Sequence, residues 1–394
     1  MKCFSLCLGS TILAALTIVS CGSHSVSESA GSGAVPAGVD GDKAPEAKGY
    51  KVDLVVEGFD RPWGLTWLPD GRMLLTTKSG GVYTVTGDTS TPVELVGFPE
   101  VYDGGQGGLM DVAVHPDFAK NGWVYFTAST GSGQANHTTL IRGKLTGNRL
   151  TEVKTLFEVT PLKNGGQHFG SRIVWRKDKT MLLAIGDGGN PPTKLDGEWI
   201  RNNAQNTQNH LGKVLHLTEE GKPPAKAAVS GGRPEIYSYG HRNIQGMCID
   251  PRDGTVYATE HGARGGDELN KIEAGKNYGW PKATYSKEYS GPEISPDRSL
   301  PGMVDPMLIW TPSKAPSGLA IYTGDKFPEW KGNLFSGGLV TRDVRRIVLD
   351  KSGKVTSQES IKIGARVRDV RQGPDGWLYV ITDEPGGRVL RISR

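Results

Sequence analysis

One histidine stands in a setting that suits acid–base chemistry. The stretch "GGQHFGSRIVW" (Gly165–Trp175) places His168 among glycines, a serine and Arg172, directly ahead of an apolar run. One strand later, "AIGDGGNP" carries Asp187. A carboxylate beside an imidazole sets the ring's tautomer and stabilises the cation that forms when the ring takes a proton. The pair predicts a general base, and a loop histidine without chemistry is the alternative.

Arginines and amides form a second set of candidates. "YDGGQGGLMD" places Gln106 between glycine pairs, "YSYGHRNIQG" puts Arg242 beside Asn243, and "GARVRDV" carries Arg366 and Arg368. Arginine is the natural fork for carboxylates and polarised carbonyl oxygens. Residues two apart on a strand share a face. The set therefore predicts an anionic ligand, whereas plain turns and a solvated strand face are the alternatives.

A further loop offers hard oxygen ligands. "EHGARGGDELNKIEAGKNYGWP" combines glycines with Asp267 and Glu268. Carboxylates completed by backbone carbonyls suit Ca²⁺, and the spacing is not that of an EF-hand. A solvated acidic turn is the alternative.

A repeated unit indicates which elements position these loops. An apolar segment reaches a Pro-Asp or Asp-Gly turn, a second strand follows, and six copies occur along the chain. Asp-Gly between alternating strands is a strong hairpin signal, and 55 glycines and 24 prolines supply many tight turns. The copies predict an all-β fold, a six-bladed β-propeller of four-stranded antiparallel blades, with a pair of sandwiches as the alternative. They start at Gly64, Asp111, Arg172, Gly246, Gly318 and Asp369.

A strand outside the repeats closes the predicted ring. "YKVDLVVEGF" (Tyr50–Phe59) precedes the first copy, and we expect it to pair with "GRVLRIS" (Gly387–Ser393) in the last blade. A closed ring has no exposed sheet edges. Its loops gather at one mouth, where residues far apart in the sequence meet.

The N-terminus reads as an export signal. Residues 1–20 have a short basic start and an apolar stretch, and "IVSC" resembles a bacterial lipobox that lipidates Cys21. We expect residues 21–49 to be a flexible tether and residues 50–394 the propeller. An ordinary cleaved signal is the alternative. The lipobox interpretation predicts an outer-membrane protein facing the periplasm, with membrane contact only through the lipid anchor.

Composition limits the function classes. The formal net charge of +4 is small for 394 residues and no basic run occurs, so nothing indicates a nucleic-acid partner. Of four cysteines, two lie in the signal and one in the lipobox, which leaves Cys248 alone and excludes an internal disulfide.

Together the loops resemble those of the soluble sugar dehydrogenases that depend on pyrroloquinoline quinone (PQQ), the aldose sugar dehydrogenase and soluble glucose dehydrogenase family. The matching motifs are "GQGGL", "H-x-G-S-R", "GDGG", "GHRNIQG", "EHG-x-x-GGDELN", "GKNYGWP" and "R-x-RDV-x-x-GPDG", in one order across most of the domain. That family is a six-bladed propeller, in agreement with the repeat count. The resemblance implies oxidation of aldoses at C1 to lactones, with hydride passing to PQQ and electrons to an external acceptor.

The resemblance also implies roles for individual residues. His168 resembles the general base and Asp187 the carboxylate that orients it. The positions that hold PQQ or its reactive carbonyl match Gln106, Arg242, Asn243, Tyr289, Arg366 and Arg368. The positions that hold Ca²⁺ match Gly262 and Ala263, with Glu268 and the backbone of Tyr278 at a second site.

The chain departs from the family pattern in two places. Many members carry a cofactor-reaching lysine where this chain has Val340, and Arg342 follows two residues later as a candidate substitute. The long insertions of the glucose-specific branch are absent, which favours the aldose branch, a broad sugar range and a monomer. Two other functions remain open: a Ca²⁺-dependent lactonase-type hydrolase, and a non-catalytic propeller that binds a protein or glycan.

Overall fold

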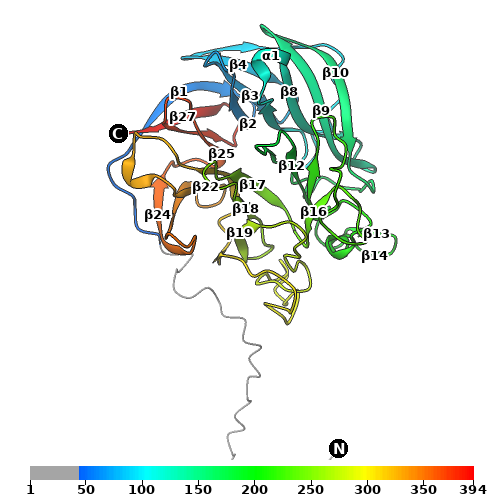
Figure 1. The fold of residues 1–394 in the computed structure, drawn as a ribbon. Helices are drawn as coiled ribbons and strands as arrows, with labels where there is room; N and C mark the ends of the chain where they lie inside the picture. The colour runs from blue at the N-terminus through cyan, green and yellow to red at the C-terminus, as the bar shows by residue number, and fades with distance from the viewer. Residues whose placement is uncertain (1–43) are drawn as a thin grey trace, which may run out of the picture. The chain divides into compact units, whose positions relative to one another are not determined.

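The described chain forms a ring of six antiparallel sheets. The computed structural model describes residues 44–394, so the predicted signal, Cys21 and most of the predicted tether lie outside it. Figure 1 shows the sheets arranged around one centre. The innermost strands of neighbouring blades contact one another around the whole ring, in the order β2, β7, β11, β17, β21, β25 and back to β2. The predicted six-bladed propeller is confirmed.

Each blade begins with one of the six sequence repeats, which forms its two inner strands. The first three blades, from the centre outwards, are β2 (Pro62–Trp67), β3 (Met73–Thr77), β4 (Val82–Thr86) and β5 (Thr89–Pro92); β7 (Leu109–Val114), β8 (Trp123–Gly131), β9 (Asn136–Thr146), β10 (Arg149–Glu158) and β6 (Glu94–Leu95); and β11 (Ile173–Trp175), β12 (Met181–Ile185), β15 (Lys213–Leu217) and β16 (Ile236–Tyr239). The second blade differs from the prediction because β6 adds a fifth strand, parallel to β10.

The other three blades have four strands each. They are β17 (Ile244–Ile249), β18 (Val256–Glu260), β19 (Asp267–Ile272) and β20 (Leu308–Trp310); β21 (Pro316–Ile321), β22 (Leu334–Gly338), β23 (Asp343–Leu349) and β24 (Val355–Lys362); and β25 (Val367–Gln372), β26 (Leu378–Thr382), β27 (Gly387–Ser393) and β1 (Lys51–Phe59). Smaller elements are the hairpin β13 (Lys194–Leu195) and β14 (Glu198–Trp199), helix α1 (Phe118–Asn121), and the 3₁₀ turns η1 (Ile200–Gln205) and η2 (Pro328–Trp330).

The ring closes as the sequence predicts. β1 pairs antiparallel with β27, from Lys51 opposite Ser393 to Phe59 opposite Gly387. Packing begins ahead of β1, because the Ala47 N–H donates to the Ser360 carbonyl of β24 and Ala47 is buried. The two ends of the described chain are thus held against the last two blades.

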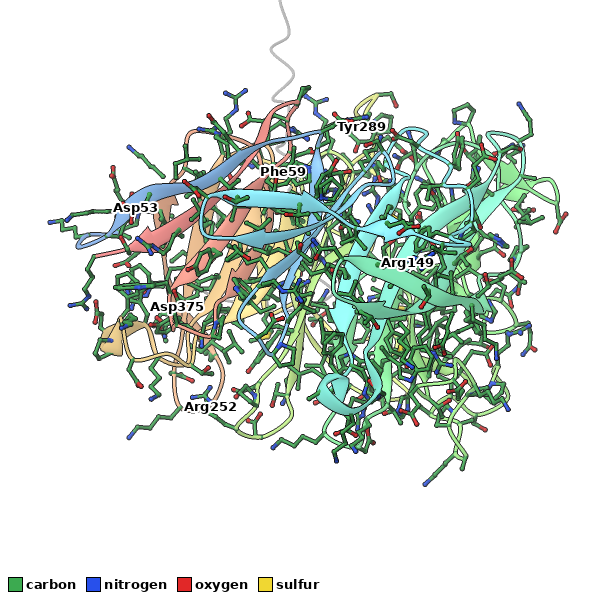
Figure 2. The ribbon with its side chains drawn as sticks, turned by 90° about the horizontal axis from the view of Figure 1, so that it is seen from above. Asp53, Phe59, Arg149, Arg252, Tyr289 and Asp375 are labelled. Carbon is green, nitrogen blue, oxygen red and sulfur yellow. The ribbon has the colours of Figure 1, made fainter. Side chains whose placement is uncertain are left out.

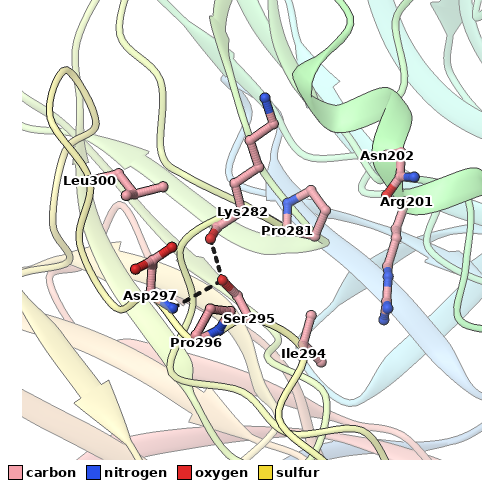
Figure 3. Close-up of a pocket in the computed structure, with 9 residues that line it drawn as sticks. All are labelled: Arg201, Asn202, Pro281, Lys282, Ile294, Ser295, Pro296, Asp297 and Leu300. Atoms are coloured by element: carbon pink, nitrogen blue, oxygen red, sulfur yellow. Dashed lines mark hydrogen bonds between the residues drawn. The ribbon is translucent and has the colours of Figure 1, made fainter.

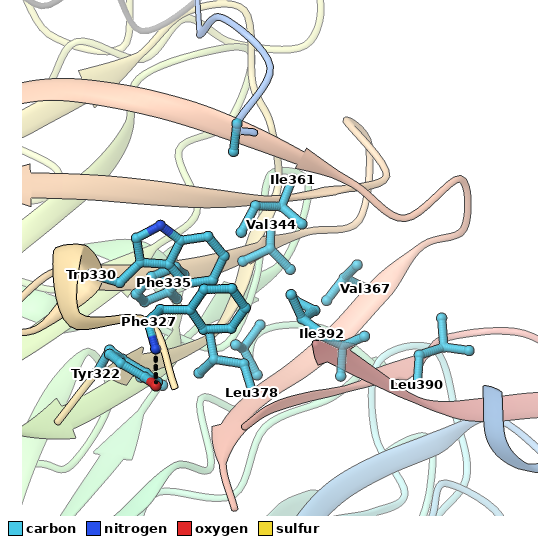
Figure 4. Close-up of a cluster of buried hydrophobic side chains, with 14 residues drawn as sticks. Tyr322, Phe327, Trp330, Phe335, Val344, Ile361, Val367, Leu378, Leu390 and Ile392 are labelled. Atoms are coloured by element: carbon cyan, nitrogen blue, oxygen red, sulfur yellow. Dashed lines mark hydrogen bonds between the residues drawn. The ribbon is translucent and has the colours of Figure 1, made fainter. Parts of the chain in front are cut away.

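The core lies between blades. Six clusters of buried apolar side chains each bridge two neighbouring sheets. Figure 4 shows the cluster between the fifth and sixth blades, where Phe327 and Trp330 stack with ring centroids 3.7 Å apart and Leu378 packs from the neighbouring sheet. No single blade buries both of its faces, so burial in all six gaps ties the blades into one unit.

Ion pairs fill the axis of the ring. Arg172 on the third blade is 1% exposed, and its Nη1 lies 3.0 Å from both Asp111 Oδ1 and Asp369 Oδ2. Arg371 lies against the same two carboxylates. A pair of buried carboxylates between two arginines is fully compensated. Arg172 therefore joins three blades and is not free for a ligand, and these axial carboxylates are not the open calcium cluster that a lactonase-type site requires.

The two faces of the ring differ. In the edge-on view of Figure 2, Tyr289 lies at one face and Arg252, in an Asp-Gly turn, at the opposite face.

Cys248 is buried and free, as its isolation in the sequence predicts. No helix within residues 44–394 has the length and apolar character to span a membrane.

Candidate active site

The predicted His–Asp pair is formed and buried. His168 lies in the loop before β11, and its Nδ1 is 2.6 Å from Oδ1 of Asp187, which follows β12. The two side chains are 2% and 0% exposed. Because a carboxylate accepts at Nδ1, this nitrogen carries the proton and Nε2 is left as an acceptor. The pair therefore presents Nε2 as a base.

Two further donors hold Asp187 in place. Trp280 donates from Nε1 to Oδ2 over 2.7 Å, and the Gly189 N–H donates to Oδ1 over 3.0 Å. Burial and the nearby Arg242 guanidinium lower the pKa of His168 below 6.5, while Asp187 opposes the shift. His168 is therefore neutral, and able to accept a proton, at neutral pH.

Gln106 fixes the backbone of the base. Its Oε1 accepts from the His168 N–H over 3.0 Å and from Asn243 Nδ2 over 3.3 Å. His168 has a φ of 51°, a strained value for a residue with a side chain, so these contacts hold an unusual backbone. A Cβ on Gly105 would lie 2.3 Å from the Gly166 carbonyl. These glycines allow the loops of Gly105 and Gly166 to meet, so the Gly105 backbone contacts protein.

Arg242 faces the same point as His168 Nε2. Its Nη1 donates to the His261 carbonyl over 3.0 Å, and its Nη2 donates to Asn190 Oδ1 over 2.7 Å. The Nδ2 of Asn190 lies 3.4 Å from His168 Nε2. One amide thus bridges His168 and Arg242.

Asn243 is a brace between loops. It is fully buried, and its Oδ1 accepts from the Gly170 N–H over 3.1 Å and from Gln245 Nε2 over 3.3 Å. Together with the bond to Gln106, these contacts tie the second, third and fourth blades together next to His168. The polar atoms of Asn243 all serve the protein.

The two arginines of the last blade converge, as predicted. Arg366 and Arg368 each donate from Nη2 to Oδ2 of Asp383 over 2.9 Å. Burial opposes ionisation of Asp383, but the two arginines hold its pKa below the ordinary range. Two cations share one carboxylate, so this group of three side chains carries a surplus positive charge. Asp383 is not among the residues predicted from the sequence.

The main cleft lies beside this set and has a cavity volume of about 830 Å³. Gly262 and Ala263 lie on its wall with Tyr289, which is 62% exposed, and Val340, which is 60% exposed. Val340 thus stands at the cleft where the family pattern has a lysine. The neighbouring Arg342 is exposed in the turn between β22 and β23, with a φ of 55°.

Glu268 faces a second carboxylate. It lies directly opposite Glu260 in the pairing of β18 with β19, and Asn270 Nδ2 donates to both, over 2.9 Å to Glu260 and 3.0 Å to Glu268. Burial and then the Glu260 charge raise the pKa of Glu268 well above its ordinary value. Asn270 Oδ1 is buried without a hydrogen-bond partner. The carboxylates of Glu260 and Glu268 repel each other when both are charged, and a cation between them would remove that repulsion.

A small cavity of about 10 Å³ lies between these two glutamates, which is near the size that one water needs. Tyr278 does not line it, and its ring stacks on His241 with centroids 4.7 Å apart. Asp267 is a loop brace, because it accepts from Ser313 Oγ and from the Gly262 and Ala315 N–H groups. Within residues 44–394, no three His, Cys, Asp or Glu side chains form a ready-made metal site.

Two side clefts adjoin the mouth, and Arg201 lines both. One is lined by Asn190, Trp199, Glu288 and Tyr289 in addition. The other, shown in Figure 3, has walls from Pro281 to Leu300, where Ser295 Oγ donates to the Lys282 carbonyl. Neither His168 nor Arg242 lines the cleft of Figure 3.

Trp280 and Asn190 are two further residues at the His168–Asp187 pair that the sequence did not predict. Trp280 stands in the "GKNYGWP" motif, whose quoted letters assign this side chain no role. Asn190 lies three residues after Asp187 in "GDGGNP", where an amide next to glycines reads as an ordinary turn. No spacing rule links either residue to His168.

The arrangement is suited to removing a proton from a hydroxyl while negative charge develops close by. A buried carboxylate-oriented imidazole acts as general base. An arginine beside it stabilises anionic oxygen. The surplus charge at the mouth attracts an anionic group.

Known proteins resemble this chain over most of its length. Residues 59–391 match the family model "Glucose / Sorbosone dehydrogenase". The chain is 49% identical over 361 residues to "Uncharacterized protein slr1608" of Synechocystis, covering 89% of this chain and 87% of that protein. It is 39% identical over 355 residues to aldose sugar dehydrogenase YliI of Escherichia coli, covering 87% of this chain and 92% of that protein.

A solved structure extends the comparison to a cofactor-bound protein. The PQQ-bound form of aldose sugar dehydrogenase from Streptomyces coelicolor superposes with a TM-score of 0.70 at 27% identity, covering 89% of this chain and 99% of that chain. The family model spans nearly all of the propeller. The chain therefore belongs to the glucose/sorbosone dehydrogenase family.

Proposed function

We propose that this protein oxidises aldose sugars at C1 to lactones, with PQQ as its cofactor and His168 as the general base. The observation that carries the proposal is the buried His168–Asp187 pair, 2.6 Å apart, whose Nε2 points to the same amide as Arg242. Membership of a sugar dehydrogenase family supports the substrate class.

The residues at the mouth fit a planar polyanion. Arg366 and Arg368 outnumber their shared carboxylate, and the buried Nε atoms of Arg242 and Arg368 have no hydrogen-bond partner. Tyr289 and Val340 give the cleft apolar walls. When bound, PQQ would supply the two-electron acceptor for the hydride from C1. The residues that would hold it are Gln106, Arg242, Tyr289, Arg366 and Arg368, while Asn243 would brace the loop of Gln106.

The protein's own residues would carry the proton chemistry. The C1 hydroxyl would donate to His168 Nε2 in place of Asn190 Nδ2, and His168 would take that proton. Asp187 would stabilise the resulting imidazolium, and Trp280 would keep Asp187 in place. Arg242 would stabilise negative oxygen at the same point.

Calcium is proposed at two positions. The paired carboxylates Glu260 and Glu268, with the unpartnered Asn270 Oδ1, have the chemistry of a hard-cation site. Glu260 and Glu268 would bind one ion, and the carbonyls of Gly262 and Ala263 would bind another beside the cofactor cleft.

We also propose that the protein is an exported monomer. A lipid on Cys21 would hold it in the outer membrane, facing the periplasm, and would be its one membrane contact. The lipobox-like "IVSC" supports this proposal. Export and labelling with a radioactive fatty acid, compared between the native chain and Cys21→Ser, tests it, and equal labelling would refute the anchor.

Reconstitution tests the activity. The protein without residues 1–20 is mixed with PQQ and Ca²⁺, and dye reduction is followed with a panel of aldoses. We expect reduction that needs sugar, PQQ and protein together. No PQQ-dependent reduction with any aldose would refute the proposed function.

A further inference from the structure

A side cleft next to the base has features that the proposed oxidation does not use. Its cavity volume is about 400 Å³. Its lining includes Asn190, Trp199, Arg201, Glu288, Tyr289 and Ser290. Asn190 also contacts His168 Nε2, so the inner end of the cleft is the point where the C1 hydroxyl would lie.

Exposed apolar side chains gather around this region. Among residues 44–394, the exposed large apolar side chains are Leu54, Val96, Leu162, Trp199, Tyr289 and Val340. Trp199 and Tyr289 line the side cleft, and Tyr289 and Val340 line the main cleft. Apolar groups that collect at a concave surface indicate a binding site.

A dedicated element presents Trp199. The hairpin of β13 and β14 is inserted between two strands of the third blade and turns at Asp196 and Gly197, both with positive φ. Lys194 lies opposite Trp199 in this hairpin, with its Nζ 4.8 Å from the ring centroid. Lys194 does not line the cleft, so the indole meets the cleft with its other face or its edge.

The polar part of the lining is neutral overall. Arg201 Nη1 and Glu288 Oε1 form an ion pair of 2.7 Å, with side chains 11% and 22% exposed. The Arg201 guanidinium also lies 5.9 Å from the Trp280 ring centroid, next to the Asp187 network. A compensated ion pair offers donors and acceptors to hydroxyls without selecting a charged ligand.

We infer that this side cleft is a subsite for the second ring of a reducing oligosaccharide, with Trp199 as its stacking platform. An aromatic face suits the C–H face of a pyranose, while the ion pair and the Asn190 amide suit its hydroxyls. The inference rests on the proposed function, because the first ring must present its C1 hydroxyl to His168. A ring attached to that sugar then extends from Asn190 towards Trp199.

The kinetic test uses the PQQ- and Ca²⁺-loaded protein, Trp199→Ala, and the control Leu54→Ala, which removes an exposed apolar side chain from outer strand β1. Each is assayed with glucose and with cellobiose. We expect Trp199→Ala to lower kcat/KM for cellobiose about tenfold, mainly through KM, and to leave glucose within about twofold. Equal losses on both sugars, or no loss on either, would overturn the subsite.

A binding test separates the subsite from the oxidation. Methyl β-cellobioside has no free C1 hydroxyl and cannot be oxidised there, so its binding by calorimetry does not depend on turnover. We expect about tenfold weaker binding to Trp199→Ala and no change with Leu54→Ala. If no sugar is oxidised but this difference is found, the proposed function fails and the subsite stands. If the glycoside binds wild type and Trp199→Ala equally, the subsite is refuted.

Discussion

Replacing Asp187 with asparagine tests the electrostatic design of the site. All three partners of the carboxylate are donors: His168 Nδ1–H, the Gly189 N–H and Trp280 Nε1–H. An asparagine amide has one oxygen and one NH₂ group, so the NH₂ group must face at least one of these three donors. If NH₂ faces Trp280, a buried indole loses its acceptor. If NH₂ faces His168, the proton moves to Nε2 and the base can no longer accept.

The magnitude follows from the lost charged hydrogen bond. Such a bond contributes about 1.5–3 kcal/mol, which corresponds to about a 10- to 160-fold loss of kcat/KM. Because the Asp187 charge raises the pKa of His168, its removal also moves the acid limb of the pH–rate profile to lower pH. The assay is kcat/KM for dye reduction by the loaded protein between pH 5 and 9.

Asp178→Asn is the matched control for this change. Asp178 lies on the same blade, with its side chain 55% exposed in a turn, and we expect kcat/KM to stay within about twofold. If Asp187→Asn keeps wild-type kcat/KM and an unchanged acid limb, the assigned role of Asp187 is wrong.

Two further predictions concern metal and pH. Glu268→Gln removes a carboxylate that faces Glu260, and we expect weaker Ca²⁺ binding by calorimetry and a smaller Ca²⁺-dependent rise in Tm; an unchanged rise would contradict this site. Burial lowers the pKa of His210 to about 4, and its Nδ1 accepts from the Thr160 N–H, so folding keeps it neutral. The unfolded chain therefore binds the extra proton below about pH 6.5, and the free energy of unfolding falls as pH drops from there to about 4. The control is His210→Gln, whose side chain does not titrate. In denaturant unfolding, we expect the free energy of unfolding of wild type to fall by about 1.4 kcal/mol more per pH unit than that of the control in this window. Parallel curves of unfolding free energy against pH would contradict the prediction.

The fold follows closely from the sequence because its signals are local. Each repeat is two adjacent strands with a turn between them, and all six form the inner strands of a blade. The closing pair of Tyr50–Phe59 with Gly387–Ser393 was predictable because an open ring would leave unpaired edges. The fifth strand of the second blade was not, since Glu94–Leu95 is too short to have a periodicity.

The site was predictable only in part. His168 and Asp187 lie in loops one strand apart in a single blade, so their contact follows from the hairpin. Trp280 reaches Asp187 across a blade boundary, and the closed ring alone decides that contact. Asp383 meets Arg366 and Arg368 within the sixth blade, where β25 pairs with β26, so this contact is as local as the His168–Asp187 contact. Arg172 is the opposite case. It lies close to His168 in the sequence, but its side chain forms ion pairs with Asp111 and Asp369 at the centre of the ring.

The most direct test of the account is the reaction of the PQQ-loaded protein with glucose deuterated at C1, in wild type and His168→Gln. Glutamine keeps a polar side chain at this position but is not a base, so cofactor binding measured by absorbance should be retained. We predict a sugar-dependent change in cofactor absorbance that is slowed by deuterium in wild type, and a rate at least about 100-fold lower in His168→Gln. A His168→Gln protein that binds the cofactor and reacts at the wild-type rate would contradict the central claim.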